Sequence, residues 1–255
     1  KIRTVGSNIS LDRFYKKKDT ISIIKDLIEI SNPVANEKTI FVWPEGILSN
    51  ISSQDLNEYG SLFSEKFSEN HLLLVGNISQ SESDGLKNFY NSLFVFDNNL
   101  DLLDSYNKIK LVPFGEFLPF ESVLKKIGLR SLTNNYQSFS SGDKKKIIEI
   151  NQKNFSLKIL PLICYEIIYS GTLFNNSNFD LIINISEDGW FGKSIGPMQH
   201  FEHSIFRAIE SGKYIVRSSN NGIAAIINPL GRVESKINFG QSGYLDLKGI
   251  KKIQP

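Results

Sequence analysis

The sequence predicts a single α/β domain, residues 1–255, built on a mixed β-sheet. Several short runs are apolar throughout, which is typical of strands covered on both faces. Helical patterns lie between some of these runs, which favours parallel strands joined by helices. The middle of the chain has the closer spacing of antiparallel hairpins, and no repeat or linker-like segment divides it. These observations together indicate one domain with both kinds of strand pairing.

The expected strands are short and rich in Ile, Leu, Val and Phe, as strands should be. They cover residues 2–9, 39–45, 72–79, 89–97, 155–166, 180–186, 213–221 and 222–229. Asn98-Asn99 is typical of a tight turn, so 89–97 is expected to pair antiparallel with the segment that follows it. Two long loops are expected, at 112–145 and 186–199.

Three segments have the periodicity of amphipathic helices. In residues 20–31 the apolar side chains form one stripe, with Asp19 or Thr20 as the N-cap. Residues 54–69 carry a similar stripe. Residues 197–211 have Pro in the first turn and Gly212 just past the end, as helices often do.

The composition excludes several classes of protein. Hydrophobic residues make up 40% and charged residues 22%, as in globular proteins with a sizeable core. The net charge of +2 gives no indication of a nucleic-acid partner. The single cysteine excludes an internal disulfide and a site of several thiolates. No apolar run reaches the roughly 18 to 20 residues that span a bilayer. Because the chain starts with neither Met nor a signal-peptide core, we expect a soluble piece of a longer protein.

Reactive residues follow three of the expected segments. Glu45 ends TIFVWPE, Lys108 lies in YNKIK near Lys110 and Glu116, and Cys164 ends LKILPLIC. We expect them to meet in one crevice, because sites in open α/β sheets form where strands end. A carboxylate could take the thiol proton, although the reference pKa values differ by about 4 units. Desolvation raises the pKa of a carboxylate, whereas an ammonium lowers that of a thiol and stabilises an oxyanion. Glu, Lys and Cys therefore predict an acyl-transfer site that needs no histidine.

The three histidines offer competing interpretations. His200 and His203 lie three residues apart on an expected helix and share a face. A zinc site needs three or four ligands, and only His71 and Cys164 remain as His or Cys donors. We therefore expect no metal and no cofactor. A Cys–His hydrolase stays open at this point.

The sequence resembles a known superfamily in three segments. FVWPEG (41–46), YNKIKLVPFGEF (106–117) and PLICYEI (161–167) are similar to the catalytic segments of nitrilases, or carbon–nitrogen hydrolases. The longer strings LVPFGEFLPFES (111–122) and NISEDGWFGKSIGPMQHFEHSIFRAIE (184–210) resemble the periplasmic domain of the bacterial apolipoprotein N-acyltransferase family. The likeness runs from about Val5 to Val233. It implies a nitrilase-like four-layer αββα sandwich.

Carried over to matching positions, the resemblance implies roles for individual residues. Glu45 would be the general base, Lys108 the ammonium that stabilises the intermediate, and Cys164 the acylated nucleophile. Glu116 would be a second essential carboxylate that orients the site. Two further matches are expected to bind substrate by shaping the pocket: Tyr165 and Glu166.

The resemblance also implies a reaction and a location. Cys164 would take an acyl chain from a phospholipid as a thioester. The α-amine of the diacylglyceryl-cysteine of an apolipoprotein would then accept it. Phospholipid, apolipoprotein and membrane are thus the expected partners, with no nucleic acid. The domain is expected to face the periplasm at the bacterial inner membrane, between flanking membrane helices.

Apolar residues in the two long loops have two interpretations. Phe114 belongs to a group of apolar side chains in 112–140, and Trp190 and Phe191 lie in the second loop. They could pack onto the body, or they could face a membrane and admit acyl chains. We expect Phe114 and Trp190 to bind substrate. The lysine runs 16–18 and 144–146 are expected on solvated faces, with attraction to anionic headgroups as the alternative.

Two positions depart from the family pattern. SEDGW has Glu187-Asp188-Gly189 where a small neutral residue is expected at the first or third place. Phe14 and Tyr15 stand in a region where the family often has Trp.

Two other functions compete with acyl transfer to lipoproteins. A soluble amidase of the same superfamily would share Glu45, Lys108 and Cys164. A catalytically inactive binding domain is disfavoured, because all three residues are present.

Overall fold

The computed structural model describes residues 1–15, 20–48, 51, 55–83, 85–117, 119, 138–152, 155–171 and 178–250. The described residues form the strands β1 (Ile2–Ser7), β2 (Thr39–Val42), β3 (His71–Ser83), β4 (Leu86–Phe96), β5 (Leu102–Asn107), β6 (Ile148–Gln152), β7 (Phe155–Ile163), β8 (Leu181–Glu187), β9 (Tyr214–Asn220), β10 (Ala224–Ile227), β11 (Val233–Ile237) and β12 (Gly243–Leu247). The α-helices are α1 (Thr20–Ser31), α2 (Gly60–Ser64) and α4 (Gly196–Ser211), and the short 3₁₀ helices are η1 (Leu11–Phe14), η2 (Asp55–Tyr59), η4 (Cys164–Ile168) and η5 (Asp188–Phe191). Within the described ranges no helix has the length and apolarity needed to cross a bilayer.

The strands form one mixed sheet, in which nine follow the order β5-β4-β3-β2-β1-β9-β8-β7-β6. Off this path, β10 pairs with β9 and β11, and β12 pairs with β1. The central strands β3, β2, β1, β9, β8 and β7 pair in parallel. The outer pairs, such as β4 with β5 and β6 with β7, are antiparallel. The mixed sheet predicted from the sequence is therefore confirmed.

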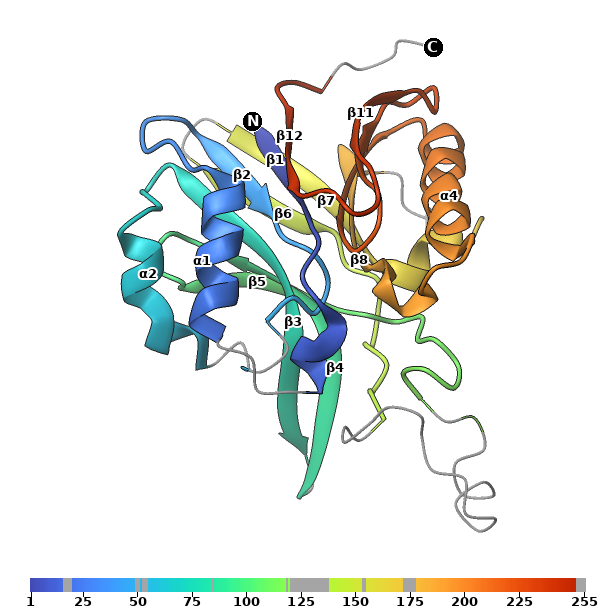
Figure 1. The fold of residues 1–255 in the computed structure, drawn as a ribbon, viewed down its shortest axis with the longest axis horizontal. Helices are drawn as coiled ribbons and strands as arrows, with labels where there is room; N and C mark the ends of the chain where they lie inside the picture. The colour runs from blue at the N-terminus through green and yellow to red at the C-terminus, as the bar shows by residue number, and fades with distance from the viewer. Residues whose placement is uncertain are drawn as a thin grey trace.

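The sheet bends at its centre into two halves that face each other. β1 and β9 share only two residue pairs, Gly6–Ser219 and Ser7–Asn220. One apolar cluster between the halves collects side chains from both of them, from β2, β3 and β4 as well as β7, β8 and β9. Figure 1 shows α1 and α2 outside one half and α4 outside the other. The four αββα layers that the resemblance implied are thus confirmed.

Strand β2 shows why the central strands are apolar throughout. Ile40 and Val42 point into the cluster between the halves. Phe41 and Trp43 point the other way, into a second cluster with α1 and α2. Successive side chains of a strand face opposite sides of the sheet. A strand that is covered on both faces therefore needs apolar residues at successive positions. A third cluster, beneath α4, covers the other half in the same way.

Most predicted elements are found, and one helix is wrong. Residues 20–31 and the helix expected at 197–211 form α1 and α4, and Gly212 ends α4 with a left-handed φ of 61°. Residues 54–69, expected as one helix, contain the two short turns η2 and α2. Gly60 lies at their junction, where its low helix propensity weakens a continuous helix. Phe63 and Phe67 of the predicted stripe are nevertheless buried.

Replacing Gly76 tests the close approach that positions the turn after β2. A Cβ at Gly76 would lie 2.5 Å from the Pro44 carbonyl oxygen and 2.6 Å from the Glu45 Cα. We expect Gly76→Ala to lower the free energy of unfolding by about 1–3 kcal/mol in urea titrations, as overpacking does. Gly60→Ala is the control, because a Cβ there meets nothing within 4 Å. Equal stabilities of the two variants would contradict this packing.

Candidate active site

Glu45 follows β2 and is almost fully buried. Trp43 anchors the turn that leads to it, donating a hydrogen bond of 2.9 Å to the Ser31 hydroxyl. The Oε1 of Glu45 accepts hydrogen bonds from Asn91 Nδ2 at 2.7 Å and from Lys108 Nζ at 3.3 Å. Its Oε2 accepts from the Glu187 backbone N–H at 2.8 Å. The carboxylate is thus held by three donors.

Lys108 follows β5 and is 1% exposed. Its N–H donates to the Asn91 carbonyl at 2.8 Å, and its own carbonyl accepts from the Gly142 N–H at 2.8 Å. Burial opposes its charge, but the carboxylates of Glu116 and Glu45 raise the pKa of Lys108 above its ordinary value. The side chain is therefore a fixed ammonium throughout the neutral range.

Glu116 lies on the other side of the ammonium. Its Oε1 accepts from Lys108 Nζ at 2.9 Å and from Asn91 Nδ2 at 2.8 Å. Its Oε2 accepts from the Val112 N–H at 2.8 Å, which fixes the start of the 112–117 loop. The structure therefore places the Lys108 ammonium in contact with the carboxylates of both Glu45 and Glu116.

Asn91 is a site residue that the sequence argument missed. Its amide bridges Glu45 and Glu116, so both carboxylates share Asn91 and Lys108 as donors. The available signal was a polar residue inside an otherwise apolar segment, FYNSLFVF, where an unpaired amide would be costly.

Cys164 lies where β7 ends and η4 begins. Its φ of 48° is in the left-handed region that non-glycine residues rarely adopt. Burial and the nearby Glu45 carboxylate raise the pKa of the Cys164 thiol well above its ordinary value, and Lys108 offsets them only in part. The Lys108 ammonium lowers the pKa of the thiol as expected from the sequence, but burial and Glu45 outweigh it. A buried neutral thiol needs a base at the moment it reacts.

The raised pKa has a direct kinetic consequence. Because the thiolate is the form that reacts, alkylation of Cys164 by iodoacetamide should rise about tenfold per pH unit through pH 9 without levelling off. Mass spectrometry of the intact chain measures it, and Cys164 is the only cysteine that can be labelled. A plateau below pH 8 would mean that Lys108 outweighs burial.

Glu166 links the segment that carries Lys108 to the segment that carries Cys164 by hydrogen bonds. The Tyr106 hydroxyl and the Ile109 and Lys110 N–H groups donate to its Oε1, at 2.7, 2.8 and 3.2 Å. The Ile163 N–H donates to its Oε2 at 2.8 Å. Burial raises the pKa of Glu166, and these donors oppose the shift. A direct contact of Glu166 with substrate stays a prediction. The hydrogen bonds that Glu166 accepts fix the segments of Lys108 and Cys164 relative to each other.

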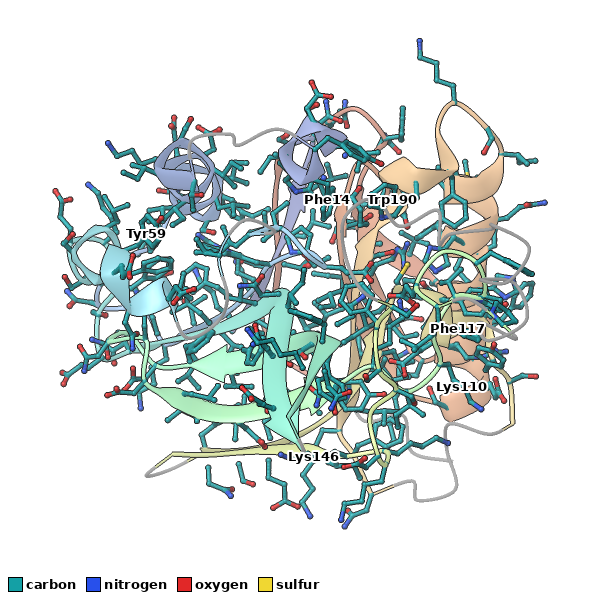
Figure 2. The ribbon with its side chains drawn as sticks, turned by 90° about the horizontal axis from the view of Figure 1, so that it is seen from below. Phe14, Tyr59, Lys110, Phe117, Lys146 and Trp190 are labelled. Carbon is teal, nitrogen blue, oxygen red and sulfur yellow. The ribbon has the colours of Figure 1, made fainter. Side chains whose placement is uncertain are left out.

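The remaining predicted substrate-binding residues are more exposed. Tyr165 is half-buried and meets Tyr169 edge-to-face, with ring centroids 5.4 Å apart. Phe114 and Trp190 are 55% and 54% exposed. The ring centroids of Trp190 and Phe14 lie 4.9 Å apart, and Figure 2 shows these two rings together. Leu118, Phe120 and the rest of the apolar group in 120–137 lie outside the described residues.

The unusual Glu187 is compensated by Arg13. The two side chains form an ion pair, and both are buried. The Asn220 amide also donates to Glu187 Oε2, at 2.7 Å. The acidic residue that departs from the family pattern therefore has its own partners, and its backbone N–H still reaches Glu45.

The histidines do not form a metal centre among the described residues, where no group of three or more His, Cys, Asp or Glu could hold an ion. His71 accepts the Ser68 N–H at 3.0 Å, and its other nitrogen lies 3.0 Å from the Val34 carbonyl. His200 is buried between Asp188 and the Cys164 backbone, and His203 is half-buried.

Comparisons with known proteins show the family of the chain. A family model described as carbon-nitrogen hydrolase matches residues 8–247. The chain belongs to the carbon–nitrogen hydrolase family. Solved structures share the fold of this chain. A superfamily protein from Xanthomonas campestris has a TM-score of 0.61 at 15% identity, covering 96% of this chain and 88% of that one. A glutamine-dependent NAD+ synthetase from Acinetobacter baumannii has a TM-score of 0.64 at 16% identity, covering 96% and 44%.

Within the carbon–nitrogen hydrolase family, the chain is similar to curated apolipoprotein N-acyltransferases. The protein of Bradyrhizobium diazoefficiens is 31% identical over 96% of this chain and 47% of its own length. That of Wigglesworthia glossinidia brevipalpis is 35% identical over 93% and 47%. That of Rickettsia prowazekii is 39% identical over 70% and 35%. The chain thus spans less than half the length of these relatives.

Proposed function

We propose that this chain carries the catalytic site of an N-acyltransferase that moves an acyl chain from a phospholipid to apolipoproteins. The observation that carries the proposal is the buried Glu45–Lys108 pair, whose two charges both act on the buried Cys164 thiol. Similarity to apolipoprotein N-acyltransferases over 96% of the chain supports the choice of substrates.

In the first step, Cys164 Sγ attacks the carbonyl carbon of a phospholipid ester. Glu45 takes the thiol proton, which a thiol of raised pKa does not lose unaided. The Lys108 ammonium stabilises the oxyanion of the tetrahedral intermediate. When the C–O bond breaks, Glu45 returns the proton to the leaving oxygen. The products are a Cys164 thioester and a lysophospholipid.

In the second step, the α-amine of the diacylglyceryl-cysteine attacks the thioester carbonyl. Glu45 takes a proton from the amine, and Lys108 again stabilises the oxyanion. The C–S bond breaks, the thiol of Cys164 recovers its proton, and an amide remains on the acceptor. A thioester suits this step because it reacts with amines more readily than the starting ester. Glu116 and Asn91 hold the Glu45 carboxylate and the Lys108 ammonium in position relative to each other.

The exposed apolar side chains support a membrane substrate. Trp190 and Phe191 in η5, Ile195 just before α4 and Met198 in its first turn are between 41% and 68% exposed. Phe114 is exposed in the loop that carries Glu116. Exposed apolar groups of this kind fit a site that receives acyl chains at a bilayer surface. We infer a periplasmic position at the inner membrane from the similarity to apolipoprotein N-acyltransferases.

A substrate assay on the full-length protein tests the proposal. Vesicles of one defined phospholipid are mixed with a diacylglyceryl-cysteine peptide that has a free α-amine. The peptide should gain the mass of one acyl chain, and lysophospholipid should appear in equal amount. Hydrolysis of small amides without acylation of the peptide would favour an amidase and contradict the proposal.

A further inference from the structure

The backbone of Cys164 is held by a histidine from another element. His200, on α4, lies with its Nε2 3.1 Å from the Cys164 carbonyl oxygen. This carbonyl belongs to the residue whose φ is 48°, an unfavourable conformation for a side chain with a Cβ. A hydrogen bond to that carbonyl therefore acts on the turn that aims the thiol.

The other nitrogen of His200 is fixed by Asp188. Nδ1 lies 2.8 Å from Asp188 Oδ1, and both side chains are buried. The Ser186 hydroxyl donates to the same oxygen at 2.7 Å. Arg217 Nη2 and the Ser219 hydroxyl donate to Oδ2 at 2.8 and 2.9 Å.

Asp188 has little room to move. A Cβ on Gly222 would lie 2.0 Å from Asp188 Oδ2, so the backbone after β9 packs directly against the carboxylate. Burial works against its charge, but Arg217 and His200 hold the pKa of Asp188 well below its usual range. The orientation of the imidazole is therefore set by an anion that is itself fixed from several sides.

These contacts direct Nε2 of His200 at the backbone of Cys164 and not at its thiol. The Cys164 carbonyl oxygen can only accept, so the Nε2 that faces it is a donor. Nδ1 lies near both Asp188 Oδ1 and Arg217 Nη2, at 2.8 and 3.2 Å. The Cys–His arrangement left open by the sequence would need a ring nitrogen that accepts from Sγ. The geometry instead directs His200 to the backbone of the nucleophile.

We propose that His200, oriented by Asp188, is a positioning residue that holds the Cys164 carbonyl and thereby keeps the thiol aimed at the acyl carbon. The inference rests on the proposed function in one respect, that Cys164 is the nucleophile. It adds residues from η5 and α4 to a site otherwise built from the ends of β2, β5 and β7.

A pair of variants of similar size separates hydrogen bonding from packing. His200→Gln keeps an N–H that can reach the Cys164 carbonyl, and His200→Met has none. The readout is the pre-steady-state burst of p-nitrophenolate from p-nitrophenyl butyrate, which reports acylation of Cys164 without a phospholipid. Thermal melting confirms that each variant is folded. Ser204→Ala and His203→Ala, on the same helix, are controls for the buried and the half-buried face.

We expect His200→Met to slow the burst tenfold to a hundredfold relative to His200→Gln, the range in which small misplacements of a reacting group fall. The half-saturating ester concentration should change by less than about threefold, because binding is not the step affected. Both controls should react like the wild type. Equal burst rates for folded Met and Gln variants would overturn the proposal. A wild-type burst with the activated ester but no reaction with phospholipid would instead count against the proposed function alone.

Discussion

Replacing Cys164 with Ala is expected to abolish acyl transfer, with a loss of at least about 10⁴-fold in kcat. No other thiol exists in the chain to form the thioester. Removing a nucleophile that acts as a unit with its base leaves only the rate due to binding and oxyanion contacts. Transfer of a labelled acyl chain to the acceptor peptide measures the effect.

The same variant should remain folded. Cys164 is 8% exposed and loses only one sulfur atom, so a change in unfolding temperature of a few degrees is the most that packing predicts. Residual transfer within tenfold of the wild type, in a folded variant, would show that another group carries the acyl chain.

Replacing Lys108 with Met should reduce acylation about 10³-fold, the upper end of what one oxyanion donor contributes. Met approximates the length of Lys but has no charge. Glu45 and Glu116 would then share only Asn91 as a common donor, with no cation between them. Because breaking a buried ion pair leaves uncompensated charge, unfolding should also be easier by about 3–5 kcal/mol.

Lys110→Met is the matched control for the Lys108 variant. Lys110 lies two residues further on, and its ammonium is 5.6 Å from the Tyr169 ring centroid, outside the Glu45–Glu116 cluster. Burst measurements should show the Lys110 variant within about threefold of the wild type. Equal losses in both variants would remove the reason for assigning the oxyanion to Lys108.

The apolar runs were sufficient to predict a mixed sheet covered on both faces, whereas the four layers were predicted from the family resemblance. Strands β6, β11 and β12 were missed, since they are short and carry alternating exposed residues that resemble loops. The helix over 54–69 was predicted from a periodic stripe alone. Its residues are buried as expected, but Gly60 and tertiary packing decide where the turns begin and end.

The candidate site was predictable wherever a reactive residue follows a strand. Glu45 and Lys108 come from segments 63 residues apart and meet because both strands end at the same edge. Asn91 lies inside β4 and Arg13 in η1, so neither follows a strand, and their roles depend on side chains that only the folded chain brings near. His200 was noticed in sequence as half of an HxxH pair, but its partners are a carboxylate and a backbone carbonyl.

The most direct test of the whole account is the mass of the enzyme after incubation with phospholipid alone. In the full-length protein we expect one added acyl chain, located by peptide mapping to the fragment that contains Cys164 and lost when the acceptor peptide is added. The Cys164→Ala variant should gain no mass. Transfer that proceeds without any adduct, or an adduct on another residue, would contradict the thioester mechanism.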